Sequence, residues 1–276
     1  MTDQELNTLS TFETGYTDST PTGDGLLRIN WYNGDPKLKT PGAFFVSQKR
    51  LDAAGIDAPD APWQPVSRTF NDGRTDDGYG LAQARLQILG IRRQDCALDA
   101  DGRITQWLNG LTRKEDRPFG WSIFVEVLLH TPGFPMPVVW SSKRVKTSMA
   151  IVANIARDFK QHILEPARKH YNNPKIPGYA FWALIKGAVD AKGAPIYEKT
   201  QGAPVTPPTL IVPDKEGVEL FKALFVGNDL LQWGEEQRGI YDDWLRTLPG
   251  DARTVEAAHD EPKNPVLPIE DDDSLF

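Results

Sequence analysis

Three observations predict an α+β fold with a small β-barrel at its core. Five segments within residues 26–146 have the composition of strands, and three of them, 26–32, 80–93 and 121–129, place apolar residues at every second position, which is the periodicity of half-buried strands. The loops between them contain glycine and proline, as in Greek-key barrels such as the OB-fold. Helical periodicity follows, and the last 26 residues are strongly acidic. We therefore expect an OB-like Greek-key β-barrel core with additional helices and a disordered acidic C-terminal tail.

The alternation places each expected strand and its two faces. The strands are expected at residues 26–32, 42–47, 80–93, 121–129 and 138–146. In the first, Leu27, Ile29 and Trp31 fall on one face, whereas Arg28 and Tyr32 fall on the other. The apolar face is expected to line the core, and the polar face to meet solvent.

Apolar residues at helical spacing follow these strands. From Met149 to Ile163 they recur every three or four positions, with Ser148 as the expected N-cap. Pro166 is expected to end or kink this helix, because proline removes a backbone hydrogen bond and clashes with the preceding turn. Strand-like runs are expected again at 179–189, 195–200 and 204–213, and helices at 216–226 and 229–247.

Length and composition predict one folded domain of a cytoplasmic protein. The expected organisation is an N-terminal arm (1–24), a single domain (25–248) and an acidic tail (249–276). No run of 18 apolar residues and no basic start followed by an apolar segment occurs, so we expect neither a membrane span nor a secretory signal. The single cysteine, Cys96, suits a reducing compartment, for which we expect the bacterial cytoplasm.

The net charge of −7 hides a basic middle region. Residues 85–199 carry 18 basic and 10 acidic residues, whereas residues 251–276 carry 2 basic and 8 acidic ones. Phosphate binding depends on local potential and not on the sum over the chain. An anionic polymer is therefore compatible with this composition as a ligand.

Cations and aromatic rings on expected strands predict a surface for single-stranded DNA. Non-specific binding of a single strand needs cations along the backbone path and ring faces on which bases stack. The residues assigned to this surface are Arg28, Tyr32, Lys37, Lys39, Phe44, Arg85, Arg92, Arg93, Lys143, Arg144 and Lys146.

The same residue types have structural interpretations. Trp31, Trp121 and Trp140 align with apolar neighbours, which favours the core over base stacking. Phe44 and Phe45 are adjacent and must point to opposite faces of a strand, so one is expected in the core and the other is available. Lysine and arginine usually form a solvated face, so the group carries more weight than any single member.

The chain ends with an acidic segment that closes on an aromatic residue. The order is Glu-Asp-Asp-Asp-Ser-Leu-Phe, which cannot fold alone because its charges repel and little apolar surface is available. Asp271, Asp272, Asp273 and Phe276 resemble the Asp-Asp-Asp-Ile-Pro-Phe tip of bacterial single-stranded DNA-binding proteins, and the similar tails of phage ones. The sequence departs from that tip at positions 274 and 275.

This resemblance implies a phage-encoded single-stranded DNA-binding protein that acts in replication, recombination or repair. Its tip would recruit a polymerase, helicase or primase and compete with DNA for the binding groove. The alternative interpretation of this segment is an acidic tail that only increases solubility. No partner in the membrane is expected, and self-association is left open.

The sequence offers little for catalysis, and we expect no enzyme, cofactor or metal. The four histidines are scattered, and no phosphate-cradling loop, nucleophile elbow or zinc-binding helix motif occurs. Asp95, Asp99 and Asp101 could form a metal-dependent nuclease cluster, although residues 99–102 favour a turn. Two alternatives remain: this nuclease, and an acidic phage inhibitor that binds a host protein and no DNA.

Overall fold

The computed structural model describes most of the chain between residues 25 and 251. The described ranges are 25–37, 39–69, 75–100, 102–109, 112–143, 145–198 and 205–251. The expected arm, Arg144, Asp101 and the four tip residues lie outside them. Residues 249–251 belong to the described part: Gly250 is buried and donates its backbone N–H to Gln94 Oε1 over 2.6 Å.

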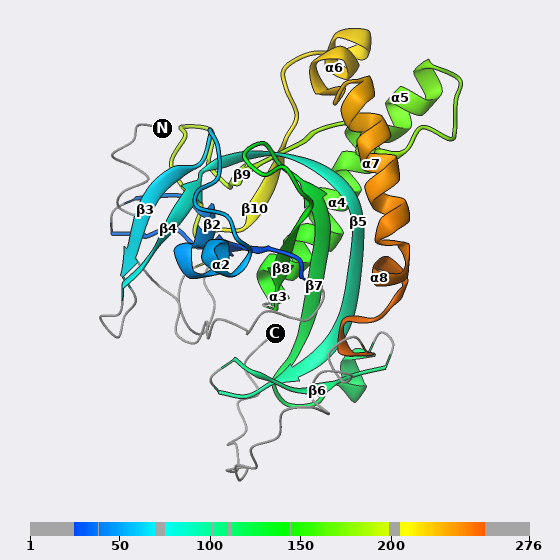
Figure 1. Cartoon of the computed structure of the whole chain (residues 1–276). Helices are drawn as coiled ribbons and strands as arrows, with labels where there is room; N and C mark the ends of the chain where they lie inside the picture. The colour runs from blue at the N-terminus through cyan, green and yellow to red at the C-terminus, as the bar shows by residue number, and fades with distance from the viewer. Residues whose placement is uncertain are drawn as a thin grey trace.

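The described strands form one curled, mixed sheet, drawn as a half-barrel in Figure 1. Its order is β10-β9-β5-β7-β8-β1-β2-β4-β3, with β6 paired to β5. The strands are β1 (Arg28–Tyr32), β2 (Ala43–Ser47), β3 (Gln64–Thr69), β4 (Thr75–Leu81), β5 (Gln83–Leu98), β6 (Ile104–Trp107), β7 (Trp121–His130), β8 (Val138–Ser142), β9 (Ala183–Gly187) and β10 (Pro208–Ile211). β1 and β8 pair in parallel, and the other neighbours pair antiparallel. The α+β prediction is confirmed.

Helices lie against this sheet. They are α2 (Gln48–Ala53), a continuous run from Val145 to His170, α6 (Gly217–Leu224), α7 (Asn228–Ile240) and α8 (Asp242–Arg246). The run comprises α3 (Val145–Met149), a π-helical stretch (Ala150–Ile155), α4 (Ala156–Phe159), a second π-helical stretch (Lys160–Leu164) and α5 (Glu165–His170). Short 3₁₀ turns occur at Lys114–Asp116 and Gly178–Ala180.

The two faces of the sheet are both covered. The long helical run buries Ile151, Ile155 and Ile163 in one apolar core, together with alternate residues of β1, β5 and β7. Figure 1 shows α7 and α8 along the outside of β5, where Trp244 and other apolar residues of these helices pack on Leu128 and its neighbours. β7 is therefore buried at nine consecutive positions, on both of its faces.

Several expected elements are confirmed and others shift. The strands at 26–32, 42–47 and 121–129 appear as β1, β2 and β7. The last strand ends at Ser142, and the helix begins at Val145, so Ser148 is not an N-cap: it is buried and its Oγ donates to the Ile123 carbonyl over 2.7 Å. Pro166 does not end the helix, because the second π-helical stretch places it in the first turn of α5, where its missing N–H is tolerated.

Candidate nucleic-acid interface

The parallel pairing of β1 and β8 brings two groups of lysines to one end of the sheet. Arg28 lies opposite Val139 and Asn30 opposite Ser141, so both strands run in the same direction. The carboxyl ends of parallel neighbours share an edge. Lys37 and Lys39 follow β1, and Lys143 and Lys146 follow β8. We call this group of four lysines the basic edge.

The loop that carries Lys37 and Lys39 is held by its own backbone and by Tyr197. The Asp35 backbone N–H donates to Thr40 Oγ1 over 2.9 Å, and the Thr40 N–H donates to the Asp35 carbonyl over 3.1 Å. The Tyr197 hydroxyl donates toward both carbonyls, at 3.0 Å from that of Asp35 and 2.8 Å from that of Thr40. Burial and the nearby Asp35 carboxylate raise the pKa of Tyr197, which keeps this hydroxyl protonated. The two lysines are exposed on a loop with defined anchors.

The same anchors join the loop to Lys146. Lys146 Nζ lies 3.1 Å from Glu198 Oε2, next to Tyr197 in the chain, and both of these charged side chains are about half exposed (53% and 41%). An exposed pair of this kind is weak and can be exchanged for a phosphate. Tyr197 and Glu198 therefore link the β1–β2 loop to the start of α3.

Lys186 and Arg85 extend this cationic surface. Gly187 packs so closely on the Gly42 backbone that an added Cβ would lie 2.8 Å from it, which places Lys186 beside the loop. Lys186 pairs with Gln83 and Leu184 pairs with Arg85, so Lys186 and Arg85 are diagonal neighbours on one face. Lys186 was not among the residues that the sequence assigned to this surface.

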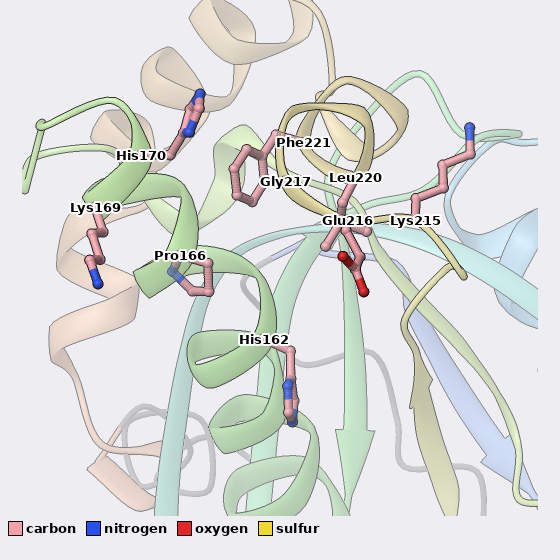
Figure 2. Close-up of a pocket in the computed structure, with 9 residues that line it drawn as sticks. All are labelled: His162, Pro166, Lys169, His170, Lys215, Glu216, Gly217, Leu220 and Phe221. Carbon is pink, nitrogen blue, oxygen red and sulfur yellow. The ribbon is translucent and has the colours of Figure 1, made fainter.

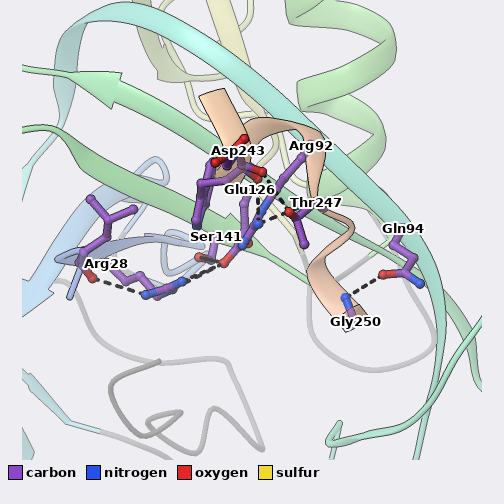
Figure 3. Close-up of polar contacts among 10 residues, drawn as sticks. Arg28, Arg92, Gln94, Glu126, Ser141, Asp243, Thr247 and Gly250 are labelled. Carbon is purple, nitrogen blue, oxygen red and sulfur yellow. Dashed lines mark hydrogen bonds and ion pairs between the residues drawn. The ribbon is translucent and has the colours of Figure 1, made fainter. Parts of the chain in front are cut away.

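Two of the arginines assigned to the DNA-binding surface are buried in the fold. The polar strand face that carries them was expected to meet solvent, and this expectation is corrected. Arg28 and Arg92 are 6% and 5% exposed, and both pair with Glu126, which is fully buried. The closest distances are 3.2 Å from Arg28 and 2.6 Å from Arg92 (Figure 3). The Arg92 guanidinium also stacks 3.6 Å from the Trp244 ring and donates to the Trp244 carbonyl. These contacts join β1, β5, β7 and α8.

Arg93 is the third assigned arginine with a carboxylate beside it. Its guanidinium is 36% exposed and lies 3.6 Å from the buried Asp95 carboxylate. Among the described residues, no contact connects Arg93 to the basic edge.

The two rings assigned to base stacking are covered, and this expectation is wrong. Tyr32 is 4% exposed and lies under the Arg68 guanidinium, 3.3 Å from the ring centroid. Phe44 is fully buried between Trp31 and Trp140, with ring centroids 5.0 and 4.9 Å away. The core interpretation of the tryptophans is confirmed, with Trp31 5%, Trp121 9% and Trp140 1% exposed.

Asp95 and Asp99, two of the three carboxylates considered for a nuclease site, hold local structure in place; the third, Asp101, lies outside the described residues. Asp95 Oδ2 accepts from Trp121 Nε1 over 3.1 Å and from the Thr112 backbone N–H over 2.8 Å. Asp99 Oδ1 accepts from the Arg103 N–H over 2.7 Å, within the turn between β5 and β6. Among the described residues, no three His, Cys, Asp or Glu side chains are grouped so that they could hold a metal ion.

Two further findings concern membrane spans and similarity to known proteins. In the part that the structure describes, no helix has the length and apolar character to cross a membrane. Comparison with protein-family models, with curated proteins and with solved structures finds no match.

Proposed function

We propose that the protein binds single-stranded DNA without sequence specificity, as a non-enzymatic, phage-type replication or recombination protein. The observation that carries this proposal is the basic edge, where the parallel pairing of β1 and β8 gathers four assigned lysines. Its acidic, Phe-terminated tip would recruit a replication protein such as a polymerase, helicase or primase, and the bacterial cytoplasm is the proposed compartment.

The curled half-barrel supports a single strand as the ligand over a duplex. It is compatible with an OB-like core, and OB-folds bind extended single strands along a curved sheet and its loops. The proposed surface follows that pattern, because it combines strand ends with the β1–β2 loop. No helix with a recognition motif for the major groove was found in the sequence.

The burial of Tyr32 and Phe44 makes the proposed binding mainly electrostatic. Each neutralised phosphate on a single strand contributes roughly −0.7 to the slope of log affinity against log salt. Four lysines therefore give a slope of about −3, so affinity falls on the order of 50-fold between roughly 50 and 200 mM salt. A strongly stacking protein would show a shallower dependence for the same affinity.

Titration of fluorescein-labelled oligo-dT with the full-length protein tests the proposal by anisotropy. Replacing Lys37, Lys39, Lys143 and Lys146 by alanine is expected to remove most of the salt dependence. The matched control replaces the exposed Lys49, Lys175, Lys192 and Lys222 by alanine, which makes the same change of net charge elsewhere. Absence of binding at low salt, or equal affinity of the two quadruple variants, would refute the proposal.

The burial of the assigned rings favours one alternative, an acidic interaction protein that binds a host protein and no DNA. It predicts no anisotropy change at any salt concentration. A metal-dependent nuclease would instead degrade the oligonucleotide when Mg²⁺ or Mn²⁺ is added, which the same sample reveals on a denaturing gel.

A further inference from the structure

A cavity of about 530 Å³ lies between the end of the long helical run and α6. This volume falls within the range of roughly 300–1,000 Å³ that is common for ligand pockets. Pro166, Leu220 and Phe221 supply its apolar lining. Figure 2 shows the Phe221 ring pointing from α6 toward the turn of helix that carries Pro166 and His170.

The rim of the cavity is rich in nitrogen donors. Lys169 and Lys215 lie on opposite sides of it, and His162 and His170 complete the helical wall (Figure 2). Lys169 and Lys215 are the two Lys or Arg side chains among the described residues that line the cavity. Among the described lining residues, Glu216 is the acidic one, and it precedes the first N–H groups of α6. An apolar floor between cations fits a ligand with carboxylates beside an apolar end.

We propose that this cavity binds the chain's own C-terminal segment, residues 270–276, in cis. Leu275 and Phe276 cover Leu220 and Phe221, and the carboxylates of residues 270–273 face Lys169 and Lys215. The segment matches the cavity in both respects, because four consecutive acidic residues precede an apolar end. The inference is independent of DNA binding, because the cavity and the basic edge are different sites.

The chain is long enough for this contact. The described part ends at Asp251 after α8, and 25 residues follow it. Between α6 and Asp251 lie α7 and α8, whose 13 and 5 residues rise roughly 20 and 8 Å. Twenty-five extended residues reach about 80 Å. Tethering at millimolar effective concentration allows even a weak contact to be populated.

The cavity is remote from the basic edge. Lys146 and His162 are 16 positions apart on the helical run, which corresponds to at most about 24 Å along its axis. β10 runs from the side of the basic edge toward the cavity. Its first residue, Pro208, pairs with Gly187, which lies beside Gly42, and the chain continues from its last residue, Ile211, to Lys215. A docked tip is therefore inaccessible to protein partners, but it does not cover the basic edge.

Photo-cross-linking of the full-length protein tests this inference. Phe276 is replaced by p-benzoylphenylalanine, and cross-linked peptides are mapped by mass spectrometry in an equal mixture of ¹⁵N-labelled and unlabelled protein. We expect cross-links to residues 160–170 or 215–221 within single chains. Cross-links to the basic edge, cross-links between chains, or the absence of any cross-link would overturn the proposal.

A charge reversal tests the role of the rim. Lys169→Glu with Lys215→Glu is expected to lower the yield of this cross-link about tenfold, because two attractions become repulsions. Lys49→Glu with Lys192→Glu is the matched control and is expected to leave the yield unchanged. Equal yields in both variants would contradict the proposed contact. Oligo-dT affinity of the first variant separates this result from a failure of the DNA proposal.

Discussion

Replacing Glu126 with glutamine is expected to destabilise the protein strongly. The carboxylate is fully buried and accepts from Arg28 Nε and Nη2 at 3.3 and 3.2 Å, and from Arg92 Nε and Nη2 at 2.8 and 2.6 Å. Glutamine has the same shape but no charge, and its NH₂ group, unlike its carbonyl oxygen, cannot accept a hydrogen bond. The guanidinium group of either Arg28 or Arg92 then faces the NH₂ group of the new glutamine, which is a donor as well.

The magnitude follows from burial of all three charged groups. Removing one partner of a buried ion pair costs about 3–5 kcal/mol, because a buried charge loses its compensation. Typical domains are stable by roughly 5–15 kcal/mol, so this is about a fifth or more of the total. At about 2–4 °C per kcal/mol for a chain of this size class, the thermal midpoint should fall by roughly 6–20 °C. Urea unfolding followed by circular dichroism measures the free energy directly.

Two variants decide whether the reasoning is correct. Glu198→Gln removes the exposed partner of Lys146 and should cost at most about 1 kcal/mol. Replacing Glu126, Arg28 and Arg92 together with methionine should recover much of the lost stability, because no buried charge remains. A cost for Glu126→Gln that equals that of Glu198→Gln would refute the claim that the network is desolvated and coupled.

Three further outcomes are expected. Gly42→Ala should cost roughly 1–3 kcal/mol in urea unfolding, since its Cβ would lie 2.5 Å from Thr206 Oγ1 and 2.6 Å from the Trp31 ring; a neutral effect would show that the loop can move. Gly239→Ala, within α7 and open to solvent, should stabilise by about 0.5–1 kcal/mol, and a lower thermal midpoint would contradict this. Burial lowers the pKa of His130 below 6.5. The unfolded state therefore binds the proton first, and stability should fall as the pH drops below 6.5 and level off below the folded pKa. His130→Phe should reduce this decline between about pH 7.5 and pH 5, and an unchanged pH profile would contradict it.

The alternation of the sequence was sufficient to place the main strands and one core. Leu27, Ile29 and Trp31 of β1 all lie in the core beneath the long helical run, as their spacing predicted. The spacing succeeded because strand residues two apart must share a face. β3 and β4 were not predicted, because few of their residues are apolar and proline or glycine interrupts both runs.

Alternation could not show that the second face is also covered. Arg92 lies directly opposite Glu126 in the β5–β7 register, and α8, about 150 residues later in the chain, closes over it. Neither this pairing nor the place where α8 packs has a local signal, although a helix at 229–247 was expected. Glu126 itself was the available hint, because a lone carboxylate amid the apolar residues 121–129 needs a cation.

The gathering of the lysines depends on an equally non-local fact. β1 and β8 are separated by about 110 residues, and nothing in either segment specifies that they pair in parallel. Without that pairing, Lys37 and Lys146 are two unrelated surface residues. The composition of the interface could be predicted from the sequence, but its location could not.

The buried arginines of the Glu126 network and the lysines of the basic edge differ as the chemistry of their head groups predicts. Arginine has a planar fork that two carboxylate oxygens satisfy, and it is less strongly hydrated than an ammonium group. Arg28 and Arg92 are accordingly buried on Glu126, whereas Lys37, Lys39 and Lys146 of the basic edge are exposed and Lys143 is partly exposed. Arg92→Lys should therefore lower stability without changing the salt slope of oligo-dT binding, because a single ammonium cannot replace the fork. Lys146→Arg should preserve both, since an exposed phosphate contact accepts either cation. Loss of DNA affinity in a folded Arg92→Lys protein would show that the network beneath α8, and not the basic edge alone, contacts the ligand.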